Sequence, residues 1–582
     1  MSFVDVAVPE LNVGTFTYEA PENLKKGARV IVEVRKFLYV GFILGLTKNL
    51  SSDVKIKPIS GIIDDEFISD YELWNMALWT SNTCLCGVGN VLRRILPNQI
   101  ITGEKIVLPP RFEIGKFSER NYFNPFDNER VNFFVDELKT DKRTLILFSR
   151  KEDAAKFFND LPDSLKSESV LWQSMSGVKA WNTWNLVNSK KIRIVIGSQN
   201  AVFAPLSPEK IIVDDEANPS YIFIKTPNIS ARTLAGVRAF YLGAEFITAG
   251  SVPSLSTFKR TNPIEKFFPE RNNVILADMF TSKNADEKGI EGHIKLTFSL
   301  LKRTKRELIK GRNVLWIFDR LGESSEVFCE NCGQSIKCEN CGHVMRSEDG
   351  GNILICQYCG NSQKLPEKCD NCGYKFFSGK RPGIEAIEKI AKRFLDNFNV
   401  SVYTQKTRSK PKGLIISTRR GLELCEKINF SLIAWLDLDF ELSGNDYNTR
   451  LKVFKMLWDS YWKGRNQNSD RKILIQARSS GIKFADLMLR GWSRFFPNEL
   501  KEREEYNLPP YGFNIEFDCD DKIIREKIID VFERENIFVM DPGDLQSPLT
   551  INENSTEKIS VILNENFSIR ERRFIKITIR SE

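Results

Sequence analysis

A segment of paired cysteines constrains this chain more than any other feature. Two cysteines separated by two residues point their thiolates at one centre, and two such pairs complete the tetrahedral S4 site that suits zinc. Eight thiolates therefore predict two closed zinc sites, with no open position for catalysis. The segment holds eight of the twelve cysteines of the chain, as the pairs Cys329/Cys332, Cys338/Cys341, Cys356/Cys359 and Cys369/Cys372.

The spacing of the pairs predicts how they combine. The first two pairs are too close in sequence to share one ion without strain, whereas the middle pairs flank a hairpin-length insert, MRSEDGGNIL, as zinc ribbons do. Disulfides are the alternative, and they would need an exported chain, which nothing in the sequence suggests. We therefore predict a nested arrangement, in which one zinc is held by Cys338, Cys341, Cys356 and Cys359 and the other by Cys329, Cys332, Cys369 and Cys372.

Length and charge set broad limits on the rest. A chain of 582 residues is long enough for several domains. Its formal charge of +8 is mildly basic, which is compatible with nucleic acid but does not require it. The chain opens without a basic apolar leader, and no apolar run approaches the roughly 18 residues of a membrane span. We expect a cytoplasmic protein that makes no contact with membranes.

The hydrophobic pattern changes along the chain. Residues 1–62 read as a small β domain, with strand-like runs such as ARVIVEVR, and residues 64–97 read as helical. From about 128, apolar runs alternate with amphipathic helices, which is typical of parallel α/β sheets. The tail from about 506 reads as α+β. The strand candidates are 144–149, 192–198, 210–216 and 245–250 in one α/β set, and 313–318, 413–418, 431–439 and 472–478 in the other.

Two α/β units suggest a nucleotide-driven motor, but part of its chemistry is missing. A P-loop needs GxxxxGK[ST], and the segment before strand 144–149, where we look for it, reads VNFFVDELKTDKR. Asp214, Asp215 and Glu216 do end a strand, where a magnesium-binding carboxylate is expected. The alternative is that these acids are solvated groups at a strand end.

Several segments, taken in order, resemble the PriA family of bacterial replication-restart proteins. Besides the zinc region, VIGSQNAVFAPL (195–206) resembles VGTRSAxFAPL, IIVDDEANPSY (211–221) resembles IIVDEEHDxSY, and AGSVPSLST (249–257) resembles GSATPSLES. ELKEREEYNLPPYG (499–512) resembles the junction before the family's C-terminal domain, and VGTFTYEAPENLKKGARVIV resembles the start of its N-terminal 3′-end-binding domain.

The departures from that family fall on its motor residues. Ala217 stands where the family's DEEH motif has His, and in STRRGLELCEKINF the expected Lys and His are Glu423 and Cys425. The segment YWKGRNQNSD keeps Gly464-Arg465, but the second Arg position falls at or near Asn468. That Arg normally stabilises the transferring phosphoryl group. The chain thus resembles the actinobacterial branch, whose helicase motifs are degenerate, which implies a scaffold without efficient ATP turnover and no catalytic residues. Whether ATP and Mg²⁺ still bind stays open.

The resemblance implies a domain order and a DNA-binding pocket. The family's Phe-Asp-Tyr pocket corresponds to Phe16, Thr17 and Tyr18, with Lys57 nearby. Thr17 has no carboxylate, so it cannot act as a charged acceptor for a 3′-hydroxyl. The alternative for Phe16 and Tyr18 is that they are core residues. The implied order is an N-terminal fork-binding domain (1–97), a linker or vestigial winged helix (98–127), RecA-like lobe 1 (128–290), RecA-like lobe 2 (291–328 and 376–505) interrupted by the two-zinc insertion (329–375), and a C-terminal α+β domain (506–582).

The function implied is replication restart without helicase activity. The resemblance implies binding to forked or single-stranded DNA, and contacts with other primosome proteins, with the loading machinery of the replicative helicase and with single-strand-binding protein. The rival from the enzyme class is an active ATP-dependent 3′-to-5′ helicase with an atypical nucleotide site. A third possibility is a zinc-ribbon scaffold that binds only proteins.

Overall fold

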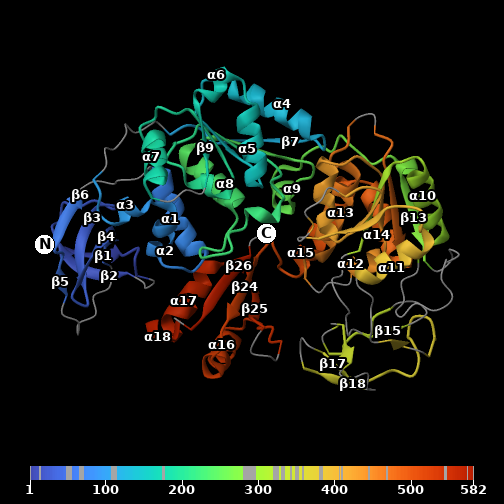
Figure 1. The fold of residues 1–582 in the computed structure, drawn as a ribbon. Helices are drawn as coiled ribbons and strands as arrows, with labels where there is room; N and C mark the ends of the chain where they lie inside the picture. Colours follow the sequence, from blue (N-terminus) through green and yellow to red (C-terminus); the bar gives the residue numbers. More distant parts are fainter. Residues whose placement is uncertain are drawn as a thin grey trace.

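The computed structural model arranges the chain around two parallel sheets, with smaller units at the periphery (Figure 1). The N-terminal sheet lies at one end of the molecule, the cysteine-rich segment lies below the second parallel sheet, and the C-terminal unit lies between these two (Figure 1). The structure describes residues 2–11, 15–47, 56–64, 71–105, 114–173, 177–279, 296–318, 327–329, 334–340, 342, 344–347, 353–356, 360–375, 377–378, 384–404, 407, 411–442, 446–466, 469–542, 547–572 and 574–580.

The N-terminal unit is a six-stranded, largely antiparallel sheet in the order β5-β2-β1-β4-β3-β6, followed by three helices. Alternating apolar residues face a small core that includes Val4, Val30 and Ile43. The predicted β domain and helical stretch are thus confirmed. The elements are β1 (Ser2–Ala7), β2 (Phe16–Ala20), β3 (Arg29–Val34), β4 (Phe37–Leu46), β5 (Lys57–Pro58), β6 (Gly61–Asp64), α1 (Tyr71–Thr83), α2 (Val88–Ile95) and α3 (Asn98–Ile101).

The first α/β lobe is a parallel sheet in the order β7-β12-β11-β8-β10-β9. Its inner strands are apolar on both faces because helices cover both sides. The strands are β7 (Ser118–Phe123), β8 (Thr144–Leu147), β9 (Ser169–Trp172), β10 (Ile194–Gly197), β11 (Lys210–Val213) and β12 (Glu245–Gly250); the helices are α4 (Asp127–Leu138), α5 (Lys151–Asp160), α6 (Asp163–Lys166), α7 (Gly177–Asn188), α8 (Ala231–Leu242) and α9 (Leu255–Thr261), with short 3₁₀ turns at Gln199–Phe203 and Pro219–Tyr221.

The second lobe repeats this architecture in the order β13-β23-β22-β14-β21-β20, again all parallel. The strands are β13 (Val274–Asp278), β14 (Asn313–Ile317), β20 (Val400–Tyr403), β21 (Leu414–Ser417), β22 (Phe430–Trp435) and β23 (Lys472–Ala477); the helices are α10 (Phe298–Ile309), α11 (Ile384–Phe394), α12 (Leu438–Leu442), α13 (Thr449–Trp462), α14 (Ser479–Leu489) and α15 (Trp492–Glu505), with 3₁₀ turns η3 (Arg271–Asn273) and η4 (Arg419–Glu426). The prediction of two α/β lobes is confirmed.

The boundaries of the two sheets differ from the expected ones. Strand β7 lies within 98–127 but pairs with β12, so this stretch supplies the edge of the first sheet. Strand β13 precedes residue 291 but pairs with β23 in the second sheet. Around residues 98–105 and 114–127 the described chain forms one short helix, strand β7 and the start of α4, which leaves no winged helix among them.

Two smaller units complete the fold. In the cysteine-rich segment, β15 pairs with β19, and β16, β17 and β18 form a three-stranded sheet. The C-terminal unit has the sheet β25-β24-β26 covered by helices. The segment SVILN (560–564) has the composition of a strand but lies in one of these helices. Their bounds are β15 (Phe328–Cys329), β16 (Arg346–Ser347), β17 (Ile353–Ile355), β18 (Ser362–Lys364), β19 (Phe377–Ser378), β24 (Phe513–Asp518), β25 (Leu549–Glu553), β26 (Lys576–Arg580), α16 (Lys522–Arg534), α17 (Thr556–Asn566) and α18 (Ile569–Arg572).

Apolar and charged contacts join these units. Helix α9 leaves the first sheet but packs in the core of the second lobe, where the Phe258 ring lies 5.9 Å from Trp492 and 5.3 Å from Phe496. Helix α1 is joined to α8 by a fully buried ion pair, Glu72 Oε1 to Arg238 Nη2 at 3.0 Å. Separating either pair of units would expose apolar surface or leave a buried charge unpaired.

Candidate functional site

The same backbone turn closes three cysteine pairs in the described part of the chain. In each, the glycine after the second cysteine has a left-handed φ of about 70°, which a residue with a Cβ adopts only with strain. The glycine N–H donates to the carbonyl oxygen of the first cysteine, which curls the backbone around the pair. The bonds are Gly342 to Cys338 at 2.8 Å, Gly360 to Cys356 at 2.9 Å and Gly373 to Cys369 at 2.7 Å.

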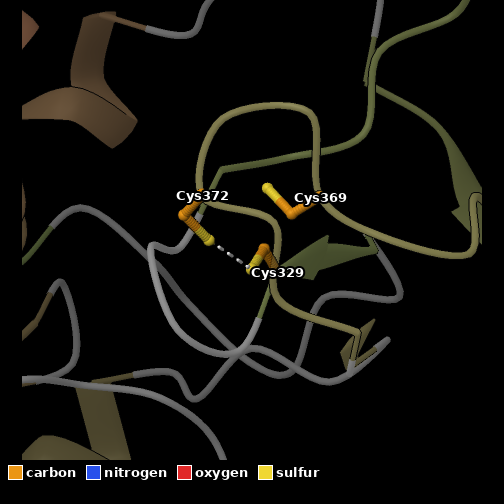
Figure 2. Close-up of side chains that lie close together, drawn as sticks. All are labelled: Cys329, Cys369 and Cys372. Atoms are coloured by element: carbon orange, nitrogen blue, oxygen red, sulfur yellow. Dashed lines mark hydrogen bonds between the residues drawn. The ribbon is translucent and has the colours of Figure 1, made fainter.

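Three sulfurs of the predicted outer site, the set Cys329, Cys332, Cys369 and Cys372, come together in space; the inner site is the other predicted set. The Sγ atoms of Cys329, Cys369 and Cys372 all lie within 4.8 Å of one another, and Cys329 Sγ is 3.6 Å from Cys372 Sγ (Figure 2). A disulfide would bring two sulfurs to about 2.05 Å. Four thiolates about 2.3 Å from one zinc lie roughly 3.8 Å apart, so the observed spacing fits a metal centre. These residues fit a metal ion.

The remaining predicted ligands are only partly described. Cys338 and Cys356 lie in one small buried cluster with Met345 and Leu354, as members of one inner site would. Cys332, Cys341 and Cys359 lie outside the described residues. The outer set thus has three of its four sulfurs together, and the inner set stays a prediction.

The predicted DNA pocket divides into buried and accessible residues. Tyr18 is 4% exposed and its hydroxyl donates to the Glu33 carbonyl oxygen at 3.0 Å, so its ring faces the core and cannot stack on a base. Phe16 packs at the edge of the same core and stays partly exposed. Lys57 lies next to Tyr18 on the sheet and forms an exposed ion pair with Glu33, 2.8 Å apart.

Thr17 lies opposite a carboxylate that the sequence reading missed. It pairs across the sheet with Asp5, and Thr17 Oγ1 donates to Asp5 Oδ1 at 3.0 Å. Thr47 Oγ1 donates to the same oxygen at 2.9 Å. Only the register of β1 against β2 places Asp5 opposite Thr17, because the two residues are twelve positions apart in the sequence.

The place of a P-loop is the connection that follows β8, and our sequence reading searched the wrong side of that strand. Only Phe148, Ser149 and Arg150 join β8 to α5, and none of them is glycine or lysine. A loop this short cannot wrap a triphosphate in backbone N–H groups as GxxxxGK[ST] does. The P-loop motif is therefore also absent from the connection after β8, where it belongs.

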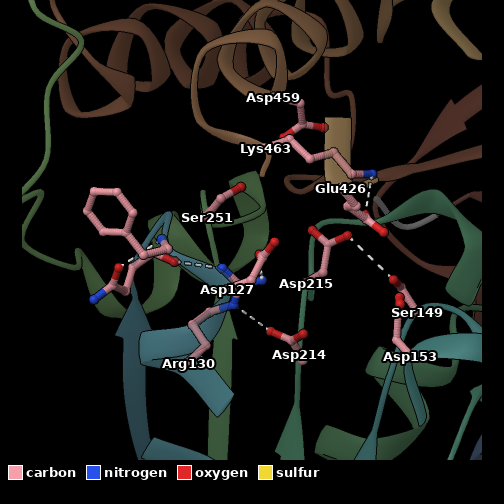
Figure 3. A network of polar contacts seen from close by, with 12 residues as sticks. Asp127, Arg130, Ser149, Asp153, Asp214, Asp215, Ser251, Glu426, Asp459 and Lys463 are labelled. Atoms are coloured by element: carbon pink, nitrogen blue, oxygen red, sulfur yellow. Dashed lines mark hydrogen bonds and ion pairs between the residues drawn. The ribbon is translucent and has the colours of Figure 1, made fainter. Parts of the chain in front are cut away.

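The acids after β11 are each paired rather than solvated. Asp214 Oδ1 lies 2.8 Å from Arg130 Nε (Figure 3). Asp215 Oδ1 lies 3.0 Å from Lys455 Nζ. Glu216 is buried, accepts from the Ser254 N–H and pairs with an arginine of α8 at 3.1 Å. The expectation of solvated groups at a strand end is therefore wrong.

Two ion pairs near the end of β11 cross between the lobes. Lys455 on α13 belongs to the second lobe, whereas Asp215 belongs to the first. Arg150, at the start of α5, reaches Glu426 of η4 at 2.8 Å. Figure 3 shows that Glu426 also pairs with Lys463, at 3.1 Å. Ion pairs between side chains of the protein thus join the two lobes at this place, where a motor would hold the phosphates of its nucleotide.

Burial and neighbouring charges shift the pKa values of the groups between the lobes. Burial alone would raise the pKa of Asp215, but Lys455 outweighs it and the pKa is lowered. Burial would lower the pKa of Lys455, but Asp215 and then Asp459 raise it. Burial raises the pKa of Asp459. The pair Lys455–Asp215 is therefore fully charged at neutral pH.

The other positions of motor motifs hold groups unsuited to phosphate. Burial raises the pKa of the Cys425 thiol to about 11, which keeps it neutral. Glu423 lies beside Arg420, 3.7 Å apart. Arg465 is buried, stacks on Tyr461 with its guanidinium 4.0 Å from the ring centre, and donates to the Ser469 carbonyl oxygen within its own lobe. Asn468 lies outside the described residues.

Comparisons with known proteins bear on the whole chain. A family model described as the PriA 3′ DNA-binding domain matches residues 4–97. Relatives named replication restart protein PriA include those of Rickettsia typhi, 22% identical over 93% of this chain and 92% of theirs, and Borreliella burgdorferi, 21% identical over 89% and 86%. The match to the Bacillus subtilis protein covers only 45% of that protein, at 22% identity.

This chain is similar over most of its length to proteins named replication restart protein PriA. The similarity runs through the N-terminal sheet, both lobes and the C-terminal unit, as the ordered motifs predicted. The solved structure of RecG bound to a three-way DNA junction also matches, with a TM-score of 0.33 and 6% identity over 74% of this chain and 46% of RecG. The PriA relatives named above come from other bacterial groups, so the actinobacterial branch stays a prediction. No helix in the described parts of the chain is long and apolar enough to cross a membrane.

Proposed function

We propose that this protein binds branched DNA in replication restart and recruits other replication proteins without using its lobes as an ATP-driven motor. One observation carries the proposal: the end of β11 and the turn after β8, where a motor would hold its nucleotide, are bridged to the second lobe by Lys455–Asp215 and Arg150–Glu426. A triphosphate entering there would have to break both pairs, and the three-residue turn after β8 offers it no replacement contacts.

The DNA-binding role rests on the N-terminal unit. The match of residues 4–97 to a 3′ DNA-binding domain supports contact with a strand end. Phe16 supplies an accessible ring edge, Lys57 a cation, and the Thr17–Asp5 pair a carboxylate that accepts hydrogen bonds. Forked and single-stranded DNA are the proposed ligands. The zinc ribbons are the proposed docking platform for primosome proteins, helicase loaders and single-strand-binding protein, with two Zn²⁺ as cofactors.

We expect a forked duplex with a free 3′ end to bind more tightly than a plain duplex of the same length. Phe16→Ala should weaken fork binding roughly ten-fold, because stacking on an aromatic ring contributes about 1–3 kcal/mol per base. Fluorescence anisotropy at a fixed salt concentration measures both. Phe117→Ala, which removes a partly exposed ring from the first lobe, is the matched control. Equal affinity for fork and duplex would refute structure-specific recognition, and no DNA binding at all would favour the protein-only scaffold.

An active helicase is the second candidate, because Asp214 and Asp215 keep the acids of a magnesium site at the end of β11. A DNA-stimulated ATPase assay separates the two functions. We expect turnover at the background of the assay, with and without forked DNA. Measurable turnover that Asp214→Asn abolishes would establish the helicase instead.

A further inference from the structure

The tip of the β3–β4 hairpin has an unusual composition. The two strands are joined by Arg35 and Lys36 alone, since Val34 pairs directly with Phe37. Both turn residues have a left-handed φ, 50° and 71°, as a two-residue turn of type I′ requires. Such turns strongly favour Asn-Gly, because long side chains adopt this conformation with strain. Two cations therefore stand where the backbone favours small residues.

Two apolar side chains next to this turn face solvent. Phe37 is 66% exposed and Leu38 is 64% exposed. Neighbouring residues of a strand point to opposite faces, so exposure of both means that the hairpin extends past the core. Arg35 and Lys36 are also exposed, and neither forms an ion pair within the described part of the chain. The tip thus presents an exposed aromatic ring beside two exposed cations, a combination that can contact both the base and the phosphates of a nucleic acid.

The tip adjoins the predicted pocket. Glu33, one residue before Val34, accepts from Tyr18 through its carbonyl oxygen and pairs with Lys57 through its carboxylate. A strand end held near Lys57 would therefore extend along the hairpin. The chemistry of the tip, a π face beside two cations, matches an unpaired base between two phosphates.

We propose that the β3–β4 tip is a second contact for single-stranded DNA, in which a base stacks on Phe37 while Arg35 and Lys36 neutralise the flanking phosphates. This inference rests on the proposed function, because it assigns further residues to the same DNA-binding unit. It also explains why the turn keeps two residues that its backbone disfavours.

The test measures anisotropy of a labelled oligo-dT on the full-length, zinc-loaded protein across a salt series. The double variant Arg35→Asn/Lys36→Gly introduces the residues that a type I′ turn prefers, so the melting temperature of the protein should not fall. Its affinity should drop about ten-fold at low salt, and the slope of log K against log salt should decrease by roughly 0.7 for each lost phosphate contact. Phe37→Ala should weaken binding roughly ten-fold with an unchanged slope.

Two matched variants serve as controls. Phe298→Ala removes a ring of similar exposure from α10, and Lys302→Ala/Lys305→Ala removes two exposed cations from the same helix; both should bind as the parent protein does. If the parent binds oligo-dT and the tip variants bind equally well, the tip inference is wrong and the proposed function stands. If the parent does not bind single-stranded or forked DNA, both are wrong.

Discussion

A Cys369→Ser variant is expected to lose one of the two proposed zinc ions and to unfold the segment around β15 and β19. Cys369 lies in the outer sulfur cluster with Cys329 and Cys372, and these short strands have little core of their own. Structural zinc contributes on the order of 10 kcal/mol to the folding of such small units, so the local loss should be complete. Metal analysis of the purified protein, together with limited proteolysis of residues 329–378, measures it.

The control for this variant is Cys519→Ser, which removes a buried thiol far from the cluster in sequence, at the end of β24. It should keep two zinc ions per chain and the parent's proteolysis pattern. A parent protein that contains no zinc, or a Cys369→Ser protein that keeps both ions, would contradict the two-site arrangement.

A Lys455→Met variant should be destabilised by about 2 kcal/mol at pH 7.5, because it leaves the half-buried carboxylates of Asp215 and Asp459 without their cation. The pKa values of Asp215 and Asp459 then rise above those of the unfolded chain, so the folded state binds more protons than the unfolded state. Stability must therefore fall as pH rises from about 4 to 8, and the loss should be smallest at low pH. Chemical denaturation of parent and variant at several pH values measures it.

Two further variants sharpen this test. Lys455→Met/Asp215→Asn removes both charges and should recover most of the lost stability. Lys139→Met breaks an exposed pair with Asp136 and should change stability by less than about 0.5 kcal/mol. If Lys455→Met behaves like Lys139→Met and shows no pH dependence, the pair does not hold the lobes together.

The inner strands of both lobes were predictable and the edge strands were not. Runs such as TLIL and IVIG are buried on both faces and read as continuous apolar segments, which gave β8 and β10. Edge strands are less buried than inner strands: β7 reads SERNYF, with little apolar signal, and β20 (VSVY) and β9 (SVLW) each bury only their first residue. All four edges, β7, β9, β13 and β20, were missed, which also displaced the expected lobe boundaries.

The candidate site divides in the same way. The cysteine spacing carries the metal prediction by itself, because the ligands and their turns are local in sequence. The partners of Asp214 and Asp215 are not local: Arg130 and Lys455 are 84 and 240 residues away along the chain. Tyr18 had the right residue type for stacking, but only the packing of the sheet shows that its ring faces inward.

The buried Glu72–Arg238 pair and the placement of α9 have a consequence for geometry. They join the N-terminal unit to the first lobe and the first lobe to the second through buried contacts. These contacts constrain where a strand end gripped at the first sheet would stand relative to the second lobe, from which the cysteine-rich segment emerges. Under the proposed function, these contacts would let the protein discriminate DNA branches by their geometry, with no ATP hydrolysis.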